Sequence, residues 1–288
     1  MSLKNLFMNG KNNTIILWLL FVLIYERRFF FNTITKRKKD IMKENKLNYY
    51  QKIKDWDFSY FDVKEEVYTN WNMFEILKNI TNKNSKILDL GTGGGEKLIK
   101  NFPKVKEILG TDYSIDMIKT ANENLKKSHR KNIKFKVMDN LKMDVPDNYY
   151  DVVVARNTVT DPKSIYKCLK KDGYLLLHDV DKYDCWDLKR TFGYGQGYED
   201  EKSISIIDYE KILASGFRNV ELIPIHAVEY YSSREELIKF LLKVPIIREF
   251  DTPNQYLDLD KLDEYIKRNT YEKGIKLIRR YYGIIAQK

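Results

Sequence analysis

The sequence contains few residues of the kinds that build disulfide or metal-bound scaffolds. Among its 288 residues there are only two cysteines, Cys168 and Cys185, and three histidines. Two cysteines cannot form a framework of several disulfides, and their separation matches no zinc-ligand spacing. We therefore expect no metal site, and a reducing cytoplasm is the simplest compartment for the chain.

The sequence also lacks an apolar run long enough to cross a bilayer. Its most apolar stretch, residues 15–25, has basic residues on both sides. A transmembrane helix needs about 20 apolar residues, so this stretch is too short to span. The residues that follow, Glu26-Arg27-Arg28-Phe29, offer no small-residue cleavage site of a secretory signal peptide.

Residues 1–41 therefore form a separate basic and apolar head, for which three interpretations remain open. A short peripheral anchor would place residues 15–39 against a membrane, with the basic run 36–39 on anionic lipid. A disordered basic head is the second interpretation. The third is an upstream extension without a role in the fold, because the sequence from Met42 resembles an ordinary cytosolic start. In each case we assign the folded domain to residues 42–288.

The positive charge is concentrated at the two ends of the chain. The formal net charge is +10, of which residues 1–41 carry +6 and residues 261–288 carry +5, so that residues 42–260 carry −1. An enzyme that acts on nucleic acid usually has a basic stripe around its site. The near-neutral middle of the chain therefore argues against a nucleic-acid partner, which remains an alternative through the basic C-terminal region.

What the chain does contain is enough apolar sequence for a large core, and a glycine-rich turn near residue 90. Hydrophobic residues make up 43% of the chain, which favours one large α/β domain with additions. Residues 86–90 predict a buried strand, which runs into Gly91-Thr92-Gly93-Gly94-Gly95. The glycines allow a close approach of the backbone to a ligand, and the helix that follows points its amino end there.

The spacing of the acid and the glycines indicates which ligand the turn takes. The pattern is D-x-G-x-G-G-G from Asp89, and the third glycine of the dinucleotide fingerprint G-x-G-x-x-G would fall at Glu96. An acid at position 89 repels a phosphate and attracts an ammonium group. A ligand with a zwitterionic amino-acid end therefore fits better than a pyrophosphate.

Two further predicted strands also end in an acid. Residues 107–112 end in Asp112, about twenty residues beyond the glycines, where a carboxylate can accept both hydroxyl protons of a ribose. Residues 133–138 are followed by Asp139 and Asn140. Acids at several strand ends on one edge of a sheet indicate a ligand site at that edge.

This order of motifs resembles the class I S-adenosylmethionine-dependent methyltransferases across residues 45–288. The resemblance implies an open, mostly parallel α/β sheet of Rossmann-like type with seven strands, an antiparallel last strand and helices on both faces. It implies S-adenosylmethionine as the cofactor and gives Tyr113 and Asp139 to the adenine. The cofactor-binding residues that we predict are Asp89, Gly91, Thr92, Gly93, Gly95, Asp112, Tyr113, Asp139, Asn140 and Arg156.

The acceptor is less clearly encoded. The chain lacks the Asn/Asp-Pro-Pro-aromatic run that methyltransferases of nucleobase amines commonly carry after the fourth strand, so this chemistry is disfavoured. His178 follows the fifth predicted strand and is a candidate general base, with a structural histidine as the alternative. Candidate acceptor contacts are Trp56 and Tyr60 in a cap over residues 45–80, and Lys189, Arg190 and Tyr194 in a glycine-rich lid over residues 187–198.

A helical insert over residues 232–278 is expected to roof the acceptor pocket, or to form a dimer face. We predict helices at residues 235–242 and 259–277, and a last strand at residues 281–286. The favoured function is methyl transfer to a small-molecule acceptor. The alternatives are an RNA or protein methyltransferase that uses a basic C-terminal helix, and a non-catalytic S-adenosylmethionine-binding protein. The basic residues are Lys267, Arg268, Lys273, Lys276, Arg279 and Arg280.

Overall fold

The computed structural model describes residues 61–247 and 258–288. The chain divides into two units between Lys52 and Ile53, and all described residues belong to the second unit. The predictions for the basic head, for Trp56 and for Tyr60 lie outside the described residues. Among the described residues, no helix combines the length and the apolar character needed to cross a membrane.

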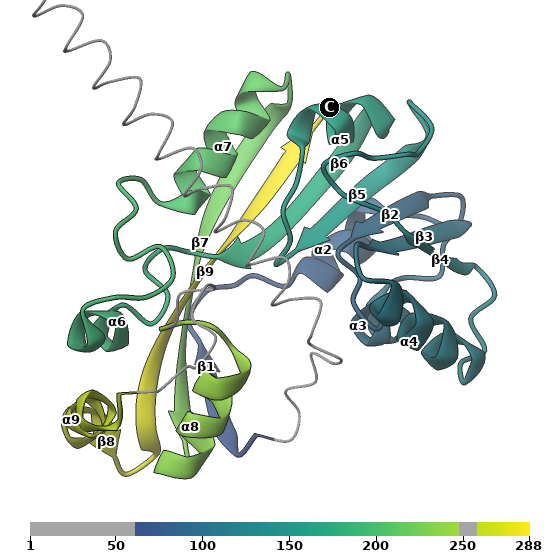
Figure 1. Ribbon diagram of the computed structural model, residues 1–288. Coiled ribbons are helices and arrows are strands. Elements are labelled where there is room, and N and C mark those ends of the chain that lie inside the picture. The colour runs from purple at the N-terminus through teal and green to yellow at the C-terminus, as the bar shows by residue number, and fades with distance from the viewer. Residues whose placement is uncertain (1–60, 248–257) are drawn as a thin grey trace, which may run out of the picture. The chain divides into compact units, whose positions relative to one another are not determined.

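A single mixed β-sheet organises the second unit (Figure 1). Along the sheet the strands follow the order β1-β7-β9-β6-β5-β2-β3-β4, and the short β8 pairs with β9. The strands are β1 (Val63–Val67), β2 (Lys86–Leu90), β3 (Glu107–Asp112), β4 (Ile133–Val137), β5 (Tyr150–Arg156), β6 (Leu169–Val180), β7 (Arg218–Tyr231), β8 (Thr270–Tyr271) and β9 (Gly274–Gln287).

The sheet has nine strands in the described part of the chain, where seven were expected. The seven predicted strands are all present, and β9 is antiparallel to both neighbours, as expected. The two additional strands are β1, which pairs with the end of β7, and the two-residue β8. Both escaped prediction because β1 lies at an edge with mostly exposed polar side chains, and β8 is too short for a pattern.

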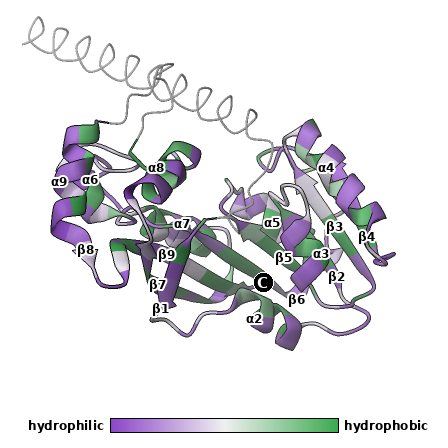
Figure 2. Cartoon of the chain, turned by 90° about the horizontal axis from the view of Figure 1, so that it is seen from below, coloured by the Kyte–Doolittle hydropathy of each residue, from purple (hydrophilic) through white to green (hydrophobic). Residues whose placement is uncertain are grey.

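The parallel strands explain why the acids meet. Side chains of β2 and β5 such as Leu88 and Val153 are fully buried, as is typical of strands covered on both faces. Because β2 pairs in parallel with β3 and β5, the carboxyl ends of these strands lie at one edge of the sheet. Figure 2 shows the apolar colouring along β5 and β6, whereas the outer helix α9 (Leu259–Asn269) is largely hydrophilic.

Helices cover both faces of the parallel part, as predicted. One face packs on α5 (Pro162–Cys168) and α7 (Ile204–Ala214), the other on α2 (Met73–Ile80) and α3 (Glu96–Asn101). The helix α4 (Ile115–Lys126) lies beside α3 (Figure 1).

A second core forms where β7 and β9 continue past the end of β6. We call residues 226–231 and 274–280 the β7–β9 extension, because these residues pair with each other beyond the last partner of β6. Around it pack α6 (Trp186–Phe192), α8 (Arg234–Lys243) and α9 (Figure 1).

The predicted C-terminal boundaries were wrong. The helix expected over residues 259–277 ends at Asn269, and the last strand begins at Gly274, not at Tyr281. Ile275, Leu277 and Arg279 are buried while the residues between them are partly exposed, which is the alternation of a strand. The insert between β7 and β9 therefore contains two helices and a hairpin in the described residues.

Candidate active site

The glycine turn after β2 is a left-handed turn packed against neighbouring protein. Gly91, Gly93 and Gly95 have φ angles of 70°, 59° and 76°, which L side chains adopt only with strain. A Cβ at Gly95 would lie 2.7 Å from the ring of Phe135, and one at Gly91 would lie 2.7 Å from the side chain of Thr158. At these two positions the protein itself requires glycine, so the turn is fixed before any ligand arrives.

Asp112, the last residue of β3, ties this turn to the next strand. Its two carboxylate oxygens accept hydrogen bonds from the backbone N–H groups of Gly93 and Ser114, both at 2.9 Å. Burial raises the pKa of Asp112, and these backbone donors oppose that shift. Each carboxylate oxygen keeps a further lone pair, so hydroxyl donors can still bind.

Asp89 and Arg156 form an ion pair at the ends of β2 and β5. The Arg156 Nη2 lies 3.4 Å from the Asp89 Oδ2, and the Asp89 side chain is fully buried. Burial raises the pKa of Asp89, against the effect of the Arg156 guanidinium. The second carboxylate oxygen of Asp89 and the Nε of Arg156 are buried and have no hydrogen-bond partner. One ligand that carries both an ammonium group and a carboxylate could satisfy both atoms.

Two more unsatisfied polar atoms belong to the same edge of the sheet. Asn140 donates through Nδ2 to Thr158 Oγ1 at 3.0 Å and to the Val159 carbonyl at 3.3 Å, while its Oδ1 has no partner. The Thr92 hydroxyl is also buried and makes no hydrogen bond of normal length, although it lies close enough to the Asp89 carboxylate to lower the pKa of that group. Among the described residues, all four buried side-chain atoms of this kind belong to the predicted cofactor-binding set. Such atoms cost about 1–3 kcal/mol each when they stay unpaired, so the residues fit a polar ligand.

The two residues predicted to border the adenine, Tyr113 and Asp139, lie on a more exposed part of this edge. Asp139 accepts a hydrogen bond from the Leu141 N–H at 2.9 Å. Tyr113, Leu141 and Val159 follow β3, β4 and β5, and their apolar side chains are exposed. Exposed apolar groups beside polar strand ends suit the flat face of a nucleobase.

His178, the candidate base, lies near the end of β6 between two aromatic rings. Its Nδ1 accepts a hydrogen bond from Trp71 Nε1 at 3.2 Å, and its ring stacks on Trp71 and Tyr281. Burial, with the cations Arg156 and Lys97, lowers the pKa of His178 to about 4. The imidazole is therefore neutral at pH 7. In the pairing of β5 with β6, His178 lies opposite Arg156.

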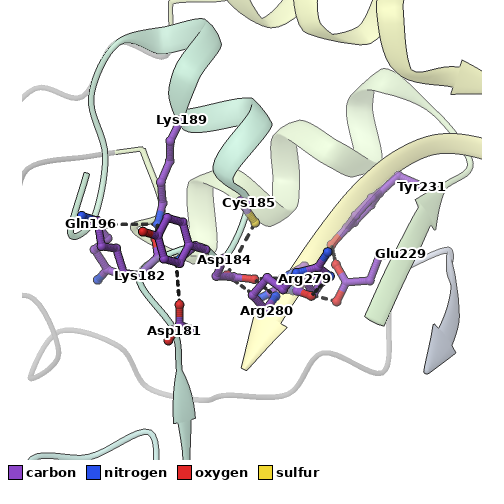
Figure 3. Close-up of polar contacts among 11 residues, drawn as sticks. Asp181, Lys182, Asp184, Cys185, Lys189, Gln196, Glu229, Tyr231, Arg279 and Arg280 are labelled. Atoms are coloured by element: carbon purple, nitrogen blue, oxygen red, sulfur yellow. Dashed lines mark hydrogen bonds and ion pairs between the residues drawn. The ribbon is translucent and has the colours of Figure 1, made fainter. Parts of the chain in front are cut away.

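The segment predicted as a lid is partly a helix, and Lys189 points into protein. Residues 186–192 form α6, which Gly193 ends in a left-handed conformation. Lys189 is 2% exposed, and its Nζ donates to the carbonyls of Lys182 and Gln196 at 3.0 and 2.7 Å (Figure 3). Burial lowers the pKa of Lys189.

The other two lid residues are exposed and lie near α9. Arg190 pairs with Asp187 at 2.6 Å, and Lys261 of α9 lies over the Tyr194 ring. In Figure 1 this segment lies beside α9, apart from the ends of β2 and β3. The structure thus groups Arg190 and Tyr194 with the helices around the β7–β9 extension and not with Asp89 or Asp112.

The predicted basic C-terminal helix does not exist. Only Lys267 and Arg268 lie on α9, and the other basic residues lie in the hairpin or on β9. Arg279 is 5% exposed and binds Asp184 through Nε at 2.9 Å and Glu229 through Nη1 at 2.6 Å (Figure 3). Sequence reasoning missed this cluster, although alternate burial from Ile275 onward would have placed Arg279 on the inner face of a strand.

No group of three or more His, Cys, Asp or Glu side chains within residues 61–247 and 258–288 is arranged to hold a metal ion. Both cysteines are free and buried, and burial raises the pKa of the Cys168 thiol to about 12. Neither thiol is therefore a reactive thiolate at neutral pH.

Known proteins are similar to this chain in sequence and in architecture. Residues 81–216 match a family described as a methyltransferase domain. Ubiquinone/menaquinone biosynthesis C-methyltransferase UbiE of Rickettsia akari (strain Hartford) is 25% identical over 171 residues, which cover 56% of this chain and 68% of that protein. The match to its counterpart in Rickettsia bellii (strain OSU 85-389) is 28% identical and covers 41% of this chain and 50% of that protein.

A second kind of relative has a different named substrate. Phosphoethanolamine N-methyltransferase of Plasmodium falciparum (isolate 3D7) is 26% identical over 189 residues, or 57% of this chain and 70% of that protein. Among solved structures, a putative methyltransferase from Bacillus halodurans is similar in fold with a TM-score of 0.53 at 17% identity, over 75% of this chain and 98% of that one. The glycine turn, the acids at the strand ends and the sheet order agree with these matches, and we conclude that residues 81–216 form a methyltransferase domain with the fold and motifs of the class I, S-adenosylmethionine-dependent enzymes.

Proposed function

We propose that this protein transfers the methyl group of S-adenosylmethionine to a small-molecule acceptor. The observation that carries the proposal is the set of four buried, unpartnered polar atoms at the carboxyl edge of the sheet. They belong to Asp89, Thr92, Asn140 and Arg156, and a ligand with several polar groups would satisfy them. The relatives named after quinone biosynthesis and phosphoethanolamine support a small acceptor.

In this proposal each residue binds a different part of the cofactor. Asp89 binds the ammonium group of the methionine end through its free oxygen, and Arg156 binds the carboxylate through Nε. Asp112 accepts hydrogen bonds from the ribose hydroxyls with the lone pairs that Gly93 and Ser114 leave free. Asp139 and Tyr113 border the adenine.

The chemistry asks little of the protein beyond alignment. The sulfonium of the bound cofactor supplies an activated methyl group. The chain holds the acceptor in line with it, and reacting atoms kept about 3–3.5 Å apart account for much of the rate acceleration. We place the acceptor beside His178, Trp71 and Tyr281, whose rings stack at the end of β6.

Methylation of RNA or protein is the less favoured function. Its main support was the basic C-terminal helix, and the structure divides those residues between α9, a hairpin and β9. Lys273 and Arg279 are engaged in ion pairs with Glu66 and Glu229. A protein that binds the cofactor without transferring its methyl group is the remaining alternative.

The test has two stages. Calorimetry with S-adenosylmethionine should show binding to the full chain, and loss of affinity in the Asp112→Asn variant, with Asp116→Asn on the exposed face of α4 as the matched control. Incubation with methyl-labelled cofactor and a metabolite extract, beside an RNA sample, should then label a small molecule. Binding without any labelled product would favour the non-catalytic alternative, and label in RNA alone would overturn the small-molecule proposal.

A further inference from the structure

His178 is held in a clamp of two aromatic side chains. The Trp71 and His178 rings are inclined by 18° with centroids 6.4 Å apart, and the His178 and Tyr281 rings by 26° with centroids 5.5 Å apart. The sheet makes room for the indole at Gly283, where a Cβ would lie 2.5 Å from the Trp71 ring. The imidazole therefore has a fixed position and plane.

The clamp also fixes the position of the imidazole proton. The indole N–H can only donate, so the Nδ1 of His178, which it contacts at 3.2 Å, must carry a lone pair. In a neutral imidazole the proton is then on Nε2. Burial and neighbouring cations lower the pKa of His178 to about 4, so the neutral form predominates at pH 7. The side chain presents an N–H donor and has no free basic nitrogen.

The two charges that lower the pKa of this imidazole are both cations. Arg156 is the register partner of His178 on the neighbouring strand, and Lys97 lies in the first turn of α3. Both cations act on His178. Burial and then Arg156 lower the pKa of Lys97, and Glu65 and Glu96 oppose that shift. Arg156 contacts Asp89 at 3.4 Å and leaves its Nε without a partner. A donor in such surroundings favours an anionic oxygen over a cation.

We infer that His178 binds the acceptor molecule by donating a hydrogen bond from Nε2 to an anionic oxygen, such as that of a carboxylate or phosphate group, and that it is not the general base. This inference rests on the proposed function and names the chemical class of the acceptor. Any proton released by the methylated atom goes to water or to another group. The candidate role that the sequence indicated for His178 is thereby replaced by recognition of charge.

Nitrogen-15 NMR of the histidine-labelled full chain tests the inference directly. The His178 signals are identified by their loss in His178→Gln, with His226→Gln as the control for an exposed histidine. We expect an Nδ1 without a proton and an Nε2 with one at pH 7. Trp71→Phe should release this preference and mix the two tautomers, whereas Trp186→Phe should leave the signals unchanged. A protonated Nδ1 in the unaltered protein would overturn the inference.

The ligand part is tested with S-adenosylhomocysteine bound, so that the anion site of the cofactor is filled. Inorganic phosphate and acetate serve as probes, and ethanolamine serves as the cationic control. A shift of the Nε2–H signal with either anion supports the inference. The anion that binds more tightly indicates whether the acceptor carries a phosphate or a carboxylate group. The affinity for that anion should fall roughly tenfold in His178→Leu and less in His178→Gln, which keeps a donor.

Two failures are distinguishable. If S-adenosylhomocysteine does not bind, the proposed function itself fails. If it binds and neither anion moves the Nε2–H signal, or if ethanolamine moves it as much, the proposed function stands and His178 is not an anion-binding residue.

Discussion

Asp89 and Arg156 are two charges that stabilise each other only in part, because each keeps a buried atom without a partner. Arg156→Gln should weaken binding of S-adenosylmethionine by about tenfold or more, since the carboxylate loses its cation. It should also lower the free energy of unfolding by roughly 3 kcal/mol, because Asp89 stays buried without its cation. Calorimetry and denaturant unfolding measure the two effects, and Arg190→Gln, which removes an exposed ion pair, is the control. Unchanged affinity in the folded Arg156 variant would remove this residue from the cofactor site.

His178 should make stability depend on pH in a defined window. Its pKa is about 4 in the folded chain and 6.5 when unperturbed, so below pH 6.5 the unfolded state binds a proton that the native state does not. The contribution is therefore complete above pH 6.5 and is lost as the pH falls towards 4, by about 3 kcal/mol. Burial raises the pKa of Asp89 and Asp112, and a raised carboxyl pKa makes the folded state more stable as the pH falls. These two groups therefore act in the opposite direction to His178.

The difference between the unaltered chain and His178→Gln isolates this group, since the carboxyl groups are common to both. Urea unfolding at several values between pH 4 and 7 should show the unaltered chain losing more stability towards acid than the variant. Parallel curves would mean that the imidazole titrates normally in the folded protein.

At the scale of elements, the glycine turn and the end of α6 offer a matched pair of glycines. Gly95 and Gly193 have φ angles of 76° and 80°. A Cβ at Gly95 would meet Phe135 at 2.7 Å and Ala121 at 3.2 Å, whereas one at Gly193 would meet nothing within 4 Å. Both alanine variants carry backbone strain of about 1 kcal/mol, and Gly95→Ala adds about 1–3 kcal/mol of overpacking. Equal unfolding free energies in the two variants would show that Phe135 on β4 moves to make room for the added methyl group.

The helix α6 carries two neighbouring cations, of which Lys189 is buried and Arg190 is exposed. Lys189→Met leaves the carbonyls of Lys182 and Gln196 without their donor, and we expect a loss of about 2 kcal/mol in the free energy of unfolding. Arg190→Met removes only the exposed contact with Asp187, for a change of about 0.5 kcal/mol or less. Thermal unfolding of both variants measures this. If the Arg190 variant is the less stable one, the segment is not anchored through Lys189.

The sequence predicted those elements whose pattern is local. The buried run of β2, the acid that ends β3 and the acid that follows β4 lie where their spacing placed them. The end of α9 was misplaced because the amphipathic pattern of its residues continues through the short segment 270–273 into the alternation of β9. Lys189 was assigned to an acceptor-binding lid and Arg279 to a basic helix, because no local pattern reveals that a charged side chain is buried by partners from other segments.

At the scale of the whole molecule, the division between Lys52 and Ile53 bears on the basic head. We expect a chain that begins at Met42 to fold and to bind S-adenosylmethionine as the full chain does, because the strands and helices that hold the predicted cofactor-binding residues begin after residue 60. Circular dichroism and calorimetry compare the two chains. Aggregation or lost affinity of the shorter chain would assign residues 1–41 to the domain. Vesicle sedimentation of the full chain separately tests a membrane contact through residues 15–39.

The position of β9 has a consequence for how the protein is made. β9 leaves the ribosome after every other strand of this sheet, yet it lies between β6 and β7 and is the strand that joins them. During translation, at about 5–20 residues per second, β7 precedes β9 by an interval on the order of seconds. Throughout that time the nascent chain holds two partial sheets with open edges, at β6 and at β7. Open edges attract other strands, so a ribosome that stalls before Gly274 would leave a chain prone to bind chaperones or to aggregate.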